Sequence, residues 1–177
     1  MATQQFNVIP AQSGIEWTGK KITGTHNGTI DIKEGALQIE NDKLTGGKFI
    51  FNTTGIKILD VTDPATNAQF AGHLASDDFF SSDKYPTATF EITSANQIAA
   101  GLYHITGNLT IKNITAPVEF DAAVTIAGGT AKASGKITID RTIYGMKFRS
   151  GNFFKDLGDT LIYNDFDLNV NIFAKAA

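Results

Sequence analysis

The chain has 177 residues and no cysteine, and only two of its fifteen cationic residues are arginines. Without thiols it forms no disulfide, thiolate metal site or cysteine nucleophile. The absence leaves the compartment open, because a cysteine-free protein suits either redox setting. The formal net charge is -3, and no basic run could follow a phosphate backbone. Nucleic acid is therefore not an expected partner.

Long hydrophobic runs are also missing. No stretch approaches the ~18 uninterrupted apolar residues of a spanning helix, so we expect no integral membrane segment. The first ten residues, MATQQFNVIP, lack the charged start, apolar middle and small-residue cleavage site of a secretory signal. Either the protein is cytoplasmic or a signal was removed. The three histidines, His26, His73 and His104, have no partner at i+2 or i+4, so no metal site is predicted.

What the sequence does contain is a period-two alternation of apolar and polar residues, which is typical of half-buried strands. The clearest runs are Phe49 and Phe51; Ala88, Phe90 and Ile92; Val118, Phe120, Ala122, Val124 and Ile126; and Phe166, Leu168, Val170 and Ile172. About eight long antiparallel strands leave two exposed edges unless the sheet closes. We therefore predict an all-β fold, a closed antiparallel eight-stranded barrel, as a single domain over residues 1–177.

Turn and helix signals divide the strands. Turns are predicted at Glu34-Gly35, Asn41-Asp42, Ala100-Gly101 and Gly128-Gly129, and a surface loop at residues 155–160. One helix is expected near residues 64–75. Asp63 is a good N-cap, Pro64 suits the first helical position, and Phe70 and Leu74 lie one turn apart.

The predicted interior is apolar and has almost no titratable group. From strand parity, the side chains expected to line it and contact a ligand are Trp17, Phe49, Phe51, Phe90 and Phe120. Phe79 and Phe80 follow two aspartates, and at least one should enter the barrel mouth, as a gate or as ordinary core capping. A completely packed core would show the same alternation, but small inward residues such as Ala88, Ala122 and Ala133 leave room for a guest.

Two polar positions have a structural and a functional interpretation. His73 near Ser76 and Asp77 could suggest nucleophilic chemistry, but we favour a cap on the helix C-terminus, where a donor meets free carbonyls. Arg141 could hold Asp77 or Asp78 as a structural strut, or contact the polar head of a ligand. We favour the strut and keep Arg141 among the candidate ligand contacts. No catalytic residue is predicted.

Several motifs together resemble one known family. The strongest are His73-Leu74-x-Ser76-x-Asp78-Phe79-Phe80, Tyr85-Pro86-x-Ala88-x-Phe90, Gly107-x-Leu109-Thr110-Ile111, Thr115-x-Pro117-Val118 and Asp140-Arg141-Thr142-x-Tyr144-Gly145. They resemble the YceI-like, polyisoprenoid-binding family over nearly the whole chain. The resemblance implies an extended lipocalin-like barrel, often dimeric and mostly periplasmic, that holds a polyisoprenoid, quinone tail or comparable amphiphile. It implies no catalytic residue and no cofactor other than the bound lipid.

Two positions depart from the family pattern. Asn113 stands where a glycine is usual, and because asparagine tolerates a left-handed backbone the turn should survive. Ile143 replaces an acidic residue before Tyr144-Gly145, so the preference for a ligand head group could differ.

Three functions follow from these observations. The leading hypothesis is non-catalytic binding, transport or sequestration of an isoprenoid or other long-chain lipid, with a homodimer as a possible assembly. The alternative is a small barrel enzyme of isomerase or cyclase type acting on an apolar substrate, which would need polar groups inside, with His104 and Glu119 as candidates. The third is an eight-stranded outer-membrane barrel, whose apolar face would point outward.

Overall fold

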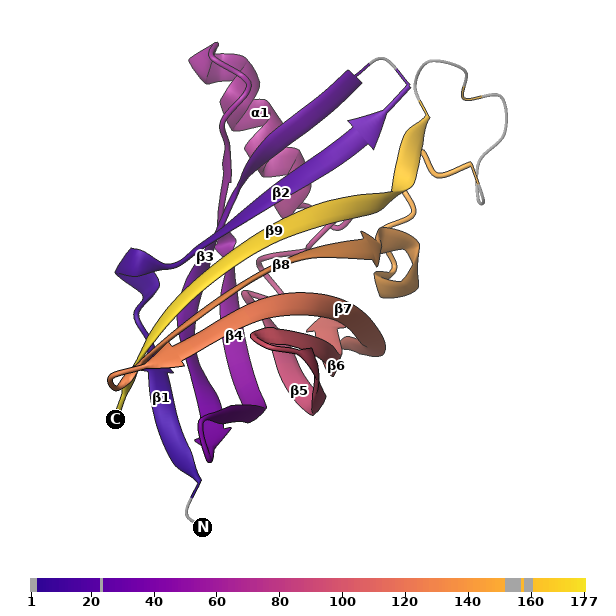
Figure 1. The fold of residues 1–177 in the computed structure, drawn as a ribbon. Coiled ribbons are helices and arrows are strands. Elements are labelled where there is room, and N and C mark those ends of the chain that lie inside the picture. The colour runs from indigo at the N-terminus through magenta and orange to yellow at the C-terminus, as the bar shows by residue number, and fades with distance from the viewer. Residues whose placement is uncertain (1–2, 23, 152–156, 158–160) are drawn as a thin grey trace.

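A computed structural model describes residues 3–22, 24–151, 157 and 161–177 and shows one closed, twisted sheet with a helix at one end (Figure 1). All strand pairs are antiparallel. The elements are β1 (Gln4–Val8), η1 (Pro10–Gln12), β2 (Gly14–Lys21), β3 (Gly24–Glu40), β4 (Lys43–Ile58), α1 (Pro64–Ala75), β5 (Thr87–Ala99), β6 (Leu102–Ile111), β7 (Ile114–Ala127), β8 (Thr130–Asp140), η2 (Arg141–Tyr144) and β9 (Ile162–Ala176).

The barrel is a meander of eight positions, which confirms the predicted eight-stranded closure. Strands β2 to β9 follow one another around the barrel, and the pairing of β2 with β9 closes it. The ninth strand, β1, lies between β3 and β9 below β2 and pairs with both. β1 and β2 therefore share one position, interrupted at η1, where Pro10 has no N–H to donate to a ladder.

Most predicted turns are confirmed. Asn41 and Asp42 have φ of 52° and 60°, and Lys112 and Asn113 have φ of 54° and 62°, so both pairs make tight left-handed hairpin turns. The turn predicted at Glu34-Gly35 is wrong. Those residues lie inside β3, where Gly35 pairs with Phe49, and a Cβ on Gly35 would stand 2.8 Å from the Phe49 ring. This glycine makes room for an aromatic side chain and does not reverse the chain.

The predicted helix is confirmed as α1, Pro64–Ala75. The Asp63 carboxylate accepts a hydrogen bond from the backbone N–H of Thr66 at 2.9 Å and so satisfies one of the free donors of the first turn. No residue of α1 is buried. No helix in the described part of the chain is long and apolar enough to cross a membrane. The loop predicted at residues 155–160 lies, apart from Leu157, outside the described residues.

The two ends of the barrel differ. The chain termini and the turns after β3, β5 and β7 lie at one end, and α1, the β2–β3 and β6–β7 turns and η2 lie at the other (Figure 1). The terminal end is filled by buried apolar side chains, among them Phe6, Ile39, Tyr103, Val124 and Ala174. Apolar side chains of the strands thus face the interior of the barrel.

Candidate functional site

A cavity of about 570 Å³ lies inside the barrel and is lined by residues of β2 to β9, α1 and η2. This volume is within the range of small-molecule binding sites. On β4 the lining extends from Leu44 to Ile56. With a rise of about 3.3 Å per residue and a strand tilt of about 40°, the lumen is about 30 Å long. Its shape therefore suits a chain-like guest better than a compact one.

Four phenylalanines form a continuous row along one wall. The rings of Phe51 and Phe49 on β4 are stacked with centroids 6.4 Å apart, and Phe49 lies 6.4 Å from Phe90 on β5. Phe90 in turn lies 5.8 Å from Phe120 on β7. Parity along each strand brings all four rings to the interior, because successive residues of a strand point to opposite faces. The row offers a smooth apolar surface to a guest.

Trp17 on β2 lies nearer the end of the barrel that carries α1. Its indole packs over Gly28, where an added Cβ would lie 2.7 Å from Trp17 Cζ2, and its ring centroid is 6.3 Å from that of Phe70 in α1. Among the described residues, Trp17 Nε1 is the one buried side-chain nitrogen or oxygen that has no hydrogen-bond partner. A buried donor without an acceptor costs about 1–3 kcal/mol. The lining therefore contains a polar N–H that an acceptor could satisfy.

A second aromatic group lies across the lumen entrance. Phe79 and Phe148 have ring centroids 5.9 Å apart, and the His73 ring meets both edge-on, at 5.1 and 4.6 Å. Phe79 is buried, Phe80 is half-buried, and both line the cavity. The two phenylalanines predicted at the mouth therefore both lie there. The gate and the cap interpretations both remain compatible with this position.

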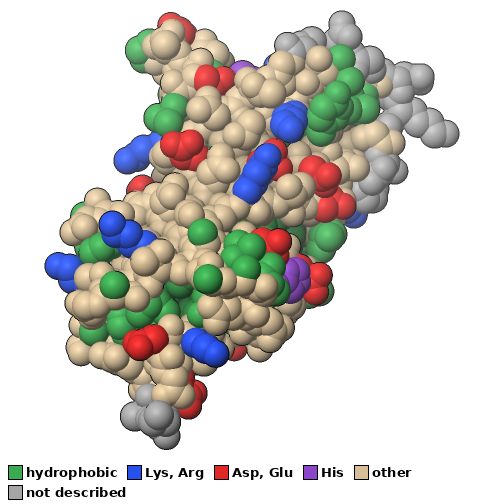
Figure 2. Space-filling view, viewed as in Figure 1, with side chains coloured by type: hydrophobic (Ala, Val, Ile, Leu, Met, Phe, Trp, Pro, Cys, Tyr) green, Lys and Arg blue, Asp and Glu red, His purple; other side chains and the backbone are tan. Residues whose placement is uncertain are grey.

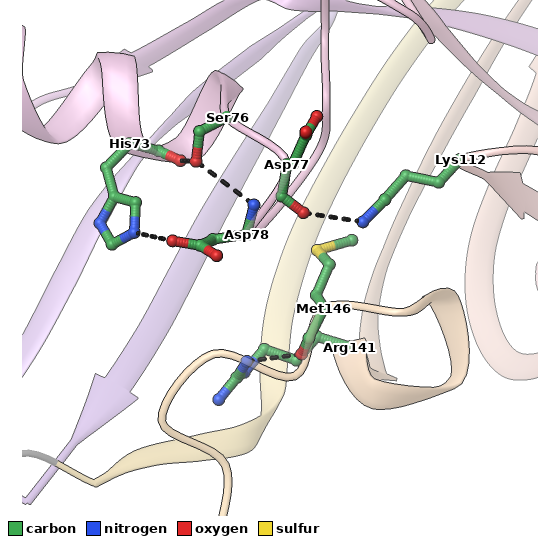
Figure 3. Close-up of polar contacts among 7 residues, drawn as sticks. All are labelled: His73, Ser76, Asp77, Asp78, Lys112, Arg141 and Met146. Atoms are coloured by element: carbon green, nitrogen blue, oxygen red, sulfur yellow. Dashed lines mark hydrogen bonds and ion pairs between the residues drawn. The ribbon is translucent and has the colours of Figure 1, made fainter. Parts of the chain in front are cut away.

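The segment after α1 is fixed by polar contacts (Figure 3). The Ser76 hydroxyl donates to the His73 carbonyl oxygen at 2.6 Å, and the His73 ring pairs with the Asp78 carboxylate at 2.9 Å. The prediction that the His73 side chain caps the helix is therefore wrong, because Ser76 takes the carbonyl and the imidazole turns to a carboxylate. The Ser76 hydroxyl bonds to the His73 carbonyl oxygen and not to the His73 ring, which is the contact that nucleophilic chemistry would use.

Two lysines, Lys112 and Lys84, contact this segment at Asp77. Lys112, after β6, donates from Nζ to the backbone carbonyl of Asp77 at 3.1 Å. Burial lowers the pKa of Lys112, and the nearby carboxylates of Asp77 and Asp78 act against that shift. The Asp77 carboxylate accepts a hydrogen bond from Ser81 and lies 3.9 Å from Lys84. The mouth of the barrel is therefore built from a short network that joins α1, β6 and the segment before β5.

Arg141 forms a strut, but with partners other than those predicted. It is 3% exposed and donates to three backbone carbonyl oxygens, those of Tyr163 at 3.0 Å, Met146 at 2.6 Å and Ile162 at 3.0 Å. The predicted partners are wrong: Asp78 pairs with His73, and Asp77 with Lys84. Burial lowers the pKa of the Arg141 guanidinium, and Asp140 partly opposes this. The guanidinium also lies 5.8 Å from the centre of the Phe79 ring.

All eight predicted site residues lie in the cavity lining, and the barrel brings them together from six separate elements or segments. They are Trp17, Phe49, Phe51, Phe79, Phe80, Phe90, Phe120 and Arg141. Whether they contact a ligand stays a prediction. Other lining residues were not among the predicted ligand contacts, notably Phe70, Met146, Phe148 and Phe166. The alternation of Tyr144, Met146 and Phe148 was the available signal for two of them.

The polar groups that the enzyme alternative places inside lie outside. His104 on β6 pairs with Asp121 at 2.9 Å on the outer face, and Glu119 on β7 is exposed. Within the described ranges, no three His, Cys, Asp or Glu side chains gather in a way that could hold a metal ion.

His26 and Asp60 form a polar pair at the mouth that predicts a pH dependence. Asp60 accepts from the His26 ring at 2.8 Å and from the Asn27 backbone N–H at 3.1 Å. Partial burial raises the pKa of Asp60, but these hydrogen bonds and the charge of His26 outweigh it, so the pKa lies below the ordinary 3.8. The resulting stabilisation is complete above about pH 4 and is lost as the pH falls through the lowered pKa.

We therefore expect the free energy of unfolding of wild type and Asp60→Asn to converge as the pH falls below about 4, and to differ most above it. Urea titrations between pH 7 and pH 2 measure this. Asp83→Asn, which changes an exposed carboxyl before β5, is the matched control. A constant difference between wild type and Asp60→Asn over the whole range would contradict the role of this pair.

Comparison with known sequences finds a single family. A family model for the YceI-like domain matches residues 6–174. A UPF0312 protein from Ectopseudomonas mendocina is 34% identical over 119 residues, 63% of this chain and 62% of that protein. Protein YceI from an Escherichia coli strain is 36% identical over 101 residues, 56% of this chain and 52% of that protein. The chain thus spans between half and two thirds of the length of these relatives.

Solved structures share the fold at lower identity. The barrel superposes on BcnA from Burkholderia cenocepacia with a TM-score of 0.77 at 20% identity, covering 95% of this chain and 99% of that one. A polyisoprenoid binding domain from Saccharophagus degradans gives a TM-score of 0.71 at 12% identity, covering 97% and 98%. At these identities the likeness shows the fold alone.

Proposed function

Because the chain belongs to the YceI-like domain family, we propose that it binds an isoprenoid or another long-chain amphiphilic lipid inside the barrel. The guest would be of polyprenyl or quinone type, and the protein would carry or sequester it without chemical change. The observation that carries this proposal is the elongated apolar cavity of about 570 Å³ inside a closed barrel. The name of the structurally similar polyisoprenoid binding domain supports the same class of ligand.

Burial of the hydrocarbon chain alone is enough to drive such binding, without a specific polar contact. Each buried methylene contributes about 0.8 kcal/mol, so a guest of several isoprene units gains more than the ordering of its chain costs. The row of Phe51, Phe49, Phe90 and Phe120 would contact the hydrocarbon chain. A polar head would find donors only toward the mouth, where Trp17 Nε1 has no acceptor and Arg141 lines the cavity. The guest would therefore enter tail first.

The absence of catalysis is part of the proposal. The titratable groups of the described cavity lining are concentrated at the mouth, as in His26, His73 and Arg141. These three side chains have structural partners: Asp60 for His26, Asp78 for His73 and three backbone carbonyls for Arg141. A histidine ring that is bonded to a carboxylate, as in His26 and His73, is not bonded to a hydroxyl or thiol that it could activate.

We also propose a homodimer, which the family resemblance implies, as a possible assembly. Light scattering would measure it.

The test is mass spectrometry of an organic extract of the purified protein, followed by titration with geranylgeraniol. We expect a co-purifying long-chain lipid or, after delipidation, saturable binding of about one geranylgeraniol per chain. Trp17 is the only tryptophan, so its fluorescence reports a guest directly. A clean extract together with no binding of geranylgeraniol or of palmitic acid would refute the proposal. Turnover of the bound lipid into a second product would refute its non-catalytic part.

A further inference from the structure

The large apolar side chains that remain exposed are concentrated at one end of the barrel. Six such side chains occur among the described residues, and five of them lie at the end that carries α1 and η2. We call these five the rim: Ile22, Leu59, Ile114, Ile143 and Tyr163. The sixth, Ile98, lies near the β5–β6 turn at the opposite end. Scattered exposed apolar residues need no explanation, but a group at one end indicates an interaction surface.

Backbone and side-chain contacts connect the rim into an arc. The backbone N–H of Ile22 donates to the Leu161 carbonyl oxygen at 3.2 Å, which places Ile22 beside the start of β9 and Tyr163. Arg141 then joins Tyr163 to η2, which carries Ile143. A Cβ at Gly145, just after η2, would lie 3.7 Å from Ile114 Cδ1. The arc therefore runs from the tip of β2 across β9 and η2 to the start of β7.

Leu59 extends the arc on the other side of the β2–β3 hairpin, since its backbone N–H donates to the Asn27 carbonyl oxygen at 3.0 Å. Figure 2 shows an apolar patch at the tips of β2 and β9, at the same end of the molecule as α1. Tyr163 belongs both to the rim and to the cavity lining, next to Ile162. The apolar surface of the lumen is therefore continuous with the apolar surface outside.

The charges near the rim are balanced. Lys21 and Lys112 lie close to it, and so do the carboxylates of Asp60 and Asp140, each held by hydrogen bonds from neighbouring residues. A surface with isoleucine, leucine and tyrosine side chains and no dominant charge matches the boundary between head groups and hydrocarbon in a bilayer, where tyrosine is enriched. An extended anionic partner would instead require a cationic patch.

We infer that the rim docks on the surface of a lipid bilayer and that the cavity exchanges its guest while the rim is inserted. This inference rests on the proposed function, because a guest with a long hydrocarbon chain is almost insoluble and has to leave a membrane to reach the lumen. Insertion of the rim places the lumen entrance against the hydrocarbon layer. The guest then passes from one apolar phase to another without crossing water.

The test is flotation with phosphatidylcholine vesicles of wild type, of the double variant Ile22→Ser/Leu59→Ser, and of Ile98→Ser. Ile98 is the matched control, because its side chain is 54% exposed, against 48% for Ile22 and 56% for Leu59. Both side chains replaced in the double variant are only about half exposed, so inserting the two together changes partitioning about tenfold or more. We expect wild type and Ile98→Ser to float equally and the double variant to lose vesicle binding about tenfold or more. Raising the salt concentration should change wild-type flotation less than twofold.

Transfer of geranylgeraniol from the same vesicles gives a second readout. With wild type the transfer rate should rise with vesicle concentration, as contact with the bilayer requires, and it should fall about tenfold for the double variant. Geranylgeraniol added from ethanol should bind all three proteins equally, so its failure to bind wild type overturns the proposed function and not the docking. If the double variant floats as well as wild type, the rim is not the docking surface. A change in its oligomeric state together with unchanged flotation would show that the rim contacts a second copy of the chain and not the bilayer.

Discussion

Ala133→Trp is expected to abolish binding of a long-chain lipid while the barrel stays folded. Ala133 lies on β8 in the cavity lining, between Val124 of β7 and Ile172 of β9, both buried. An indole there projects into the lumen and competes with the guest for a volume of about 570 Å³. Because the ring enters unfilled space and not a packed core, we expect a change of less than about 2 kcal/mol in the free energy of unfolding.

The measurement is the affinity for geranylgeraniol, which we expect to fall at least ~100-fold, since the methylenes that lose their site contribute about 0.8 kcal/mol each. Lys132→Trp is the matched control. It adds the same side chain at the neighbouring Lys132, which is exposed on the outer face of β8 and lies outside the cavity lining, and it should bind like wild type. If Ala133→Trp binds with wild-type affinity and is folded by circular dichroism, the lumen is not the site of the lipid.

Arg141→Met is expected to lower the free energy of unfolding by about 3–5 kcal/mol, because it leaves the carbonyl oxygens of Tyr163, Met146 and Ile162 without their buried donor. These bonds join η2 and the residues after it to the start of β9. Methionine keeps the apolar stem, so the loss measures the guanidinium and not the packing. Arg141→Lys should recover only part of the stability, since one ammonium cannot reach three carbonyls in the planar arrangement of a guanidinium.

Urea denaturation gives the stability, and Arg149→Met is the control because Arg149 is exposed and is the only other arginine. A loss below about 1 kcal/mol for Arg141→Met would contradict the strut. Lipid affinity of Arg141→Lys separates the two predicted roles. If Arg141→Lys binds both geranylgeraniol and the hydrocarbon squalene with unchanged affinity, Arg141 only stabilises the fold. If its affinity falls for geranylgeraniol and not for squalene, Arg141 also contacts the polar head of the ligand.

The local elements could be predicted from the sequence because their causes are local. Period-two alternation identifies a strand with one buried face, and Asp63-Pro64 identifies the first turn of α1, since a carboxylate cap and a residue without N–H act within three positions. Asn113 keeps its turn with φ of 62°, as its tolerance of a left-handed backbone predicted. The interior aromatic residues followed from parity, and all of those predicted from it line the lumen.

Partners distant in the sequence could not be predicted. A Glu-Gly pair is compatible with a turn or with a strand, and only the packing of Phe49 against Gly35 requires the strand. Arg141 bonds to backbone carbonyls that every residue possesses, so no pattern of side chains could indicate them. The His73–Asp78 contact is local, but the sequence is compatible with either partner: the imidazole bonds to Asp78 because the Ser76 hydroxyl donates to the His73 carbonyl oxygen at the helix end.

The sequence by itself determined the strands, the helix, most of the turns and the residues that face inward, since each depends on neighbours one to four positions away. Only the tertiary structure decided that β1 and β2 share one barrel position, that four phenylalanines form one row and that the exposed apolar residues gather around one mouth. These features depend on the order and register in which distant strands pair. Closure of the ring fixes that register, and no single strand encodes it.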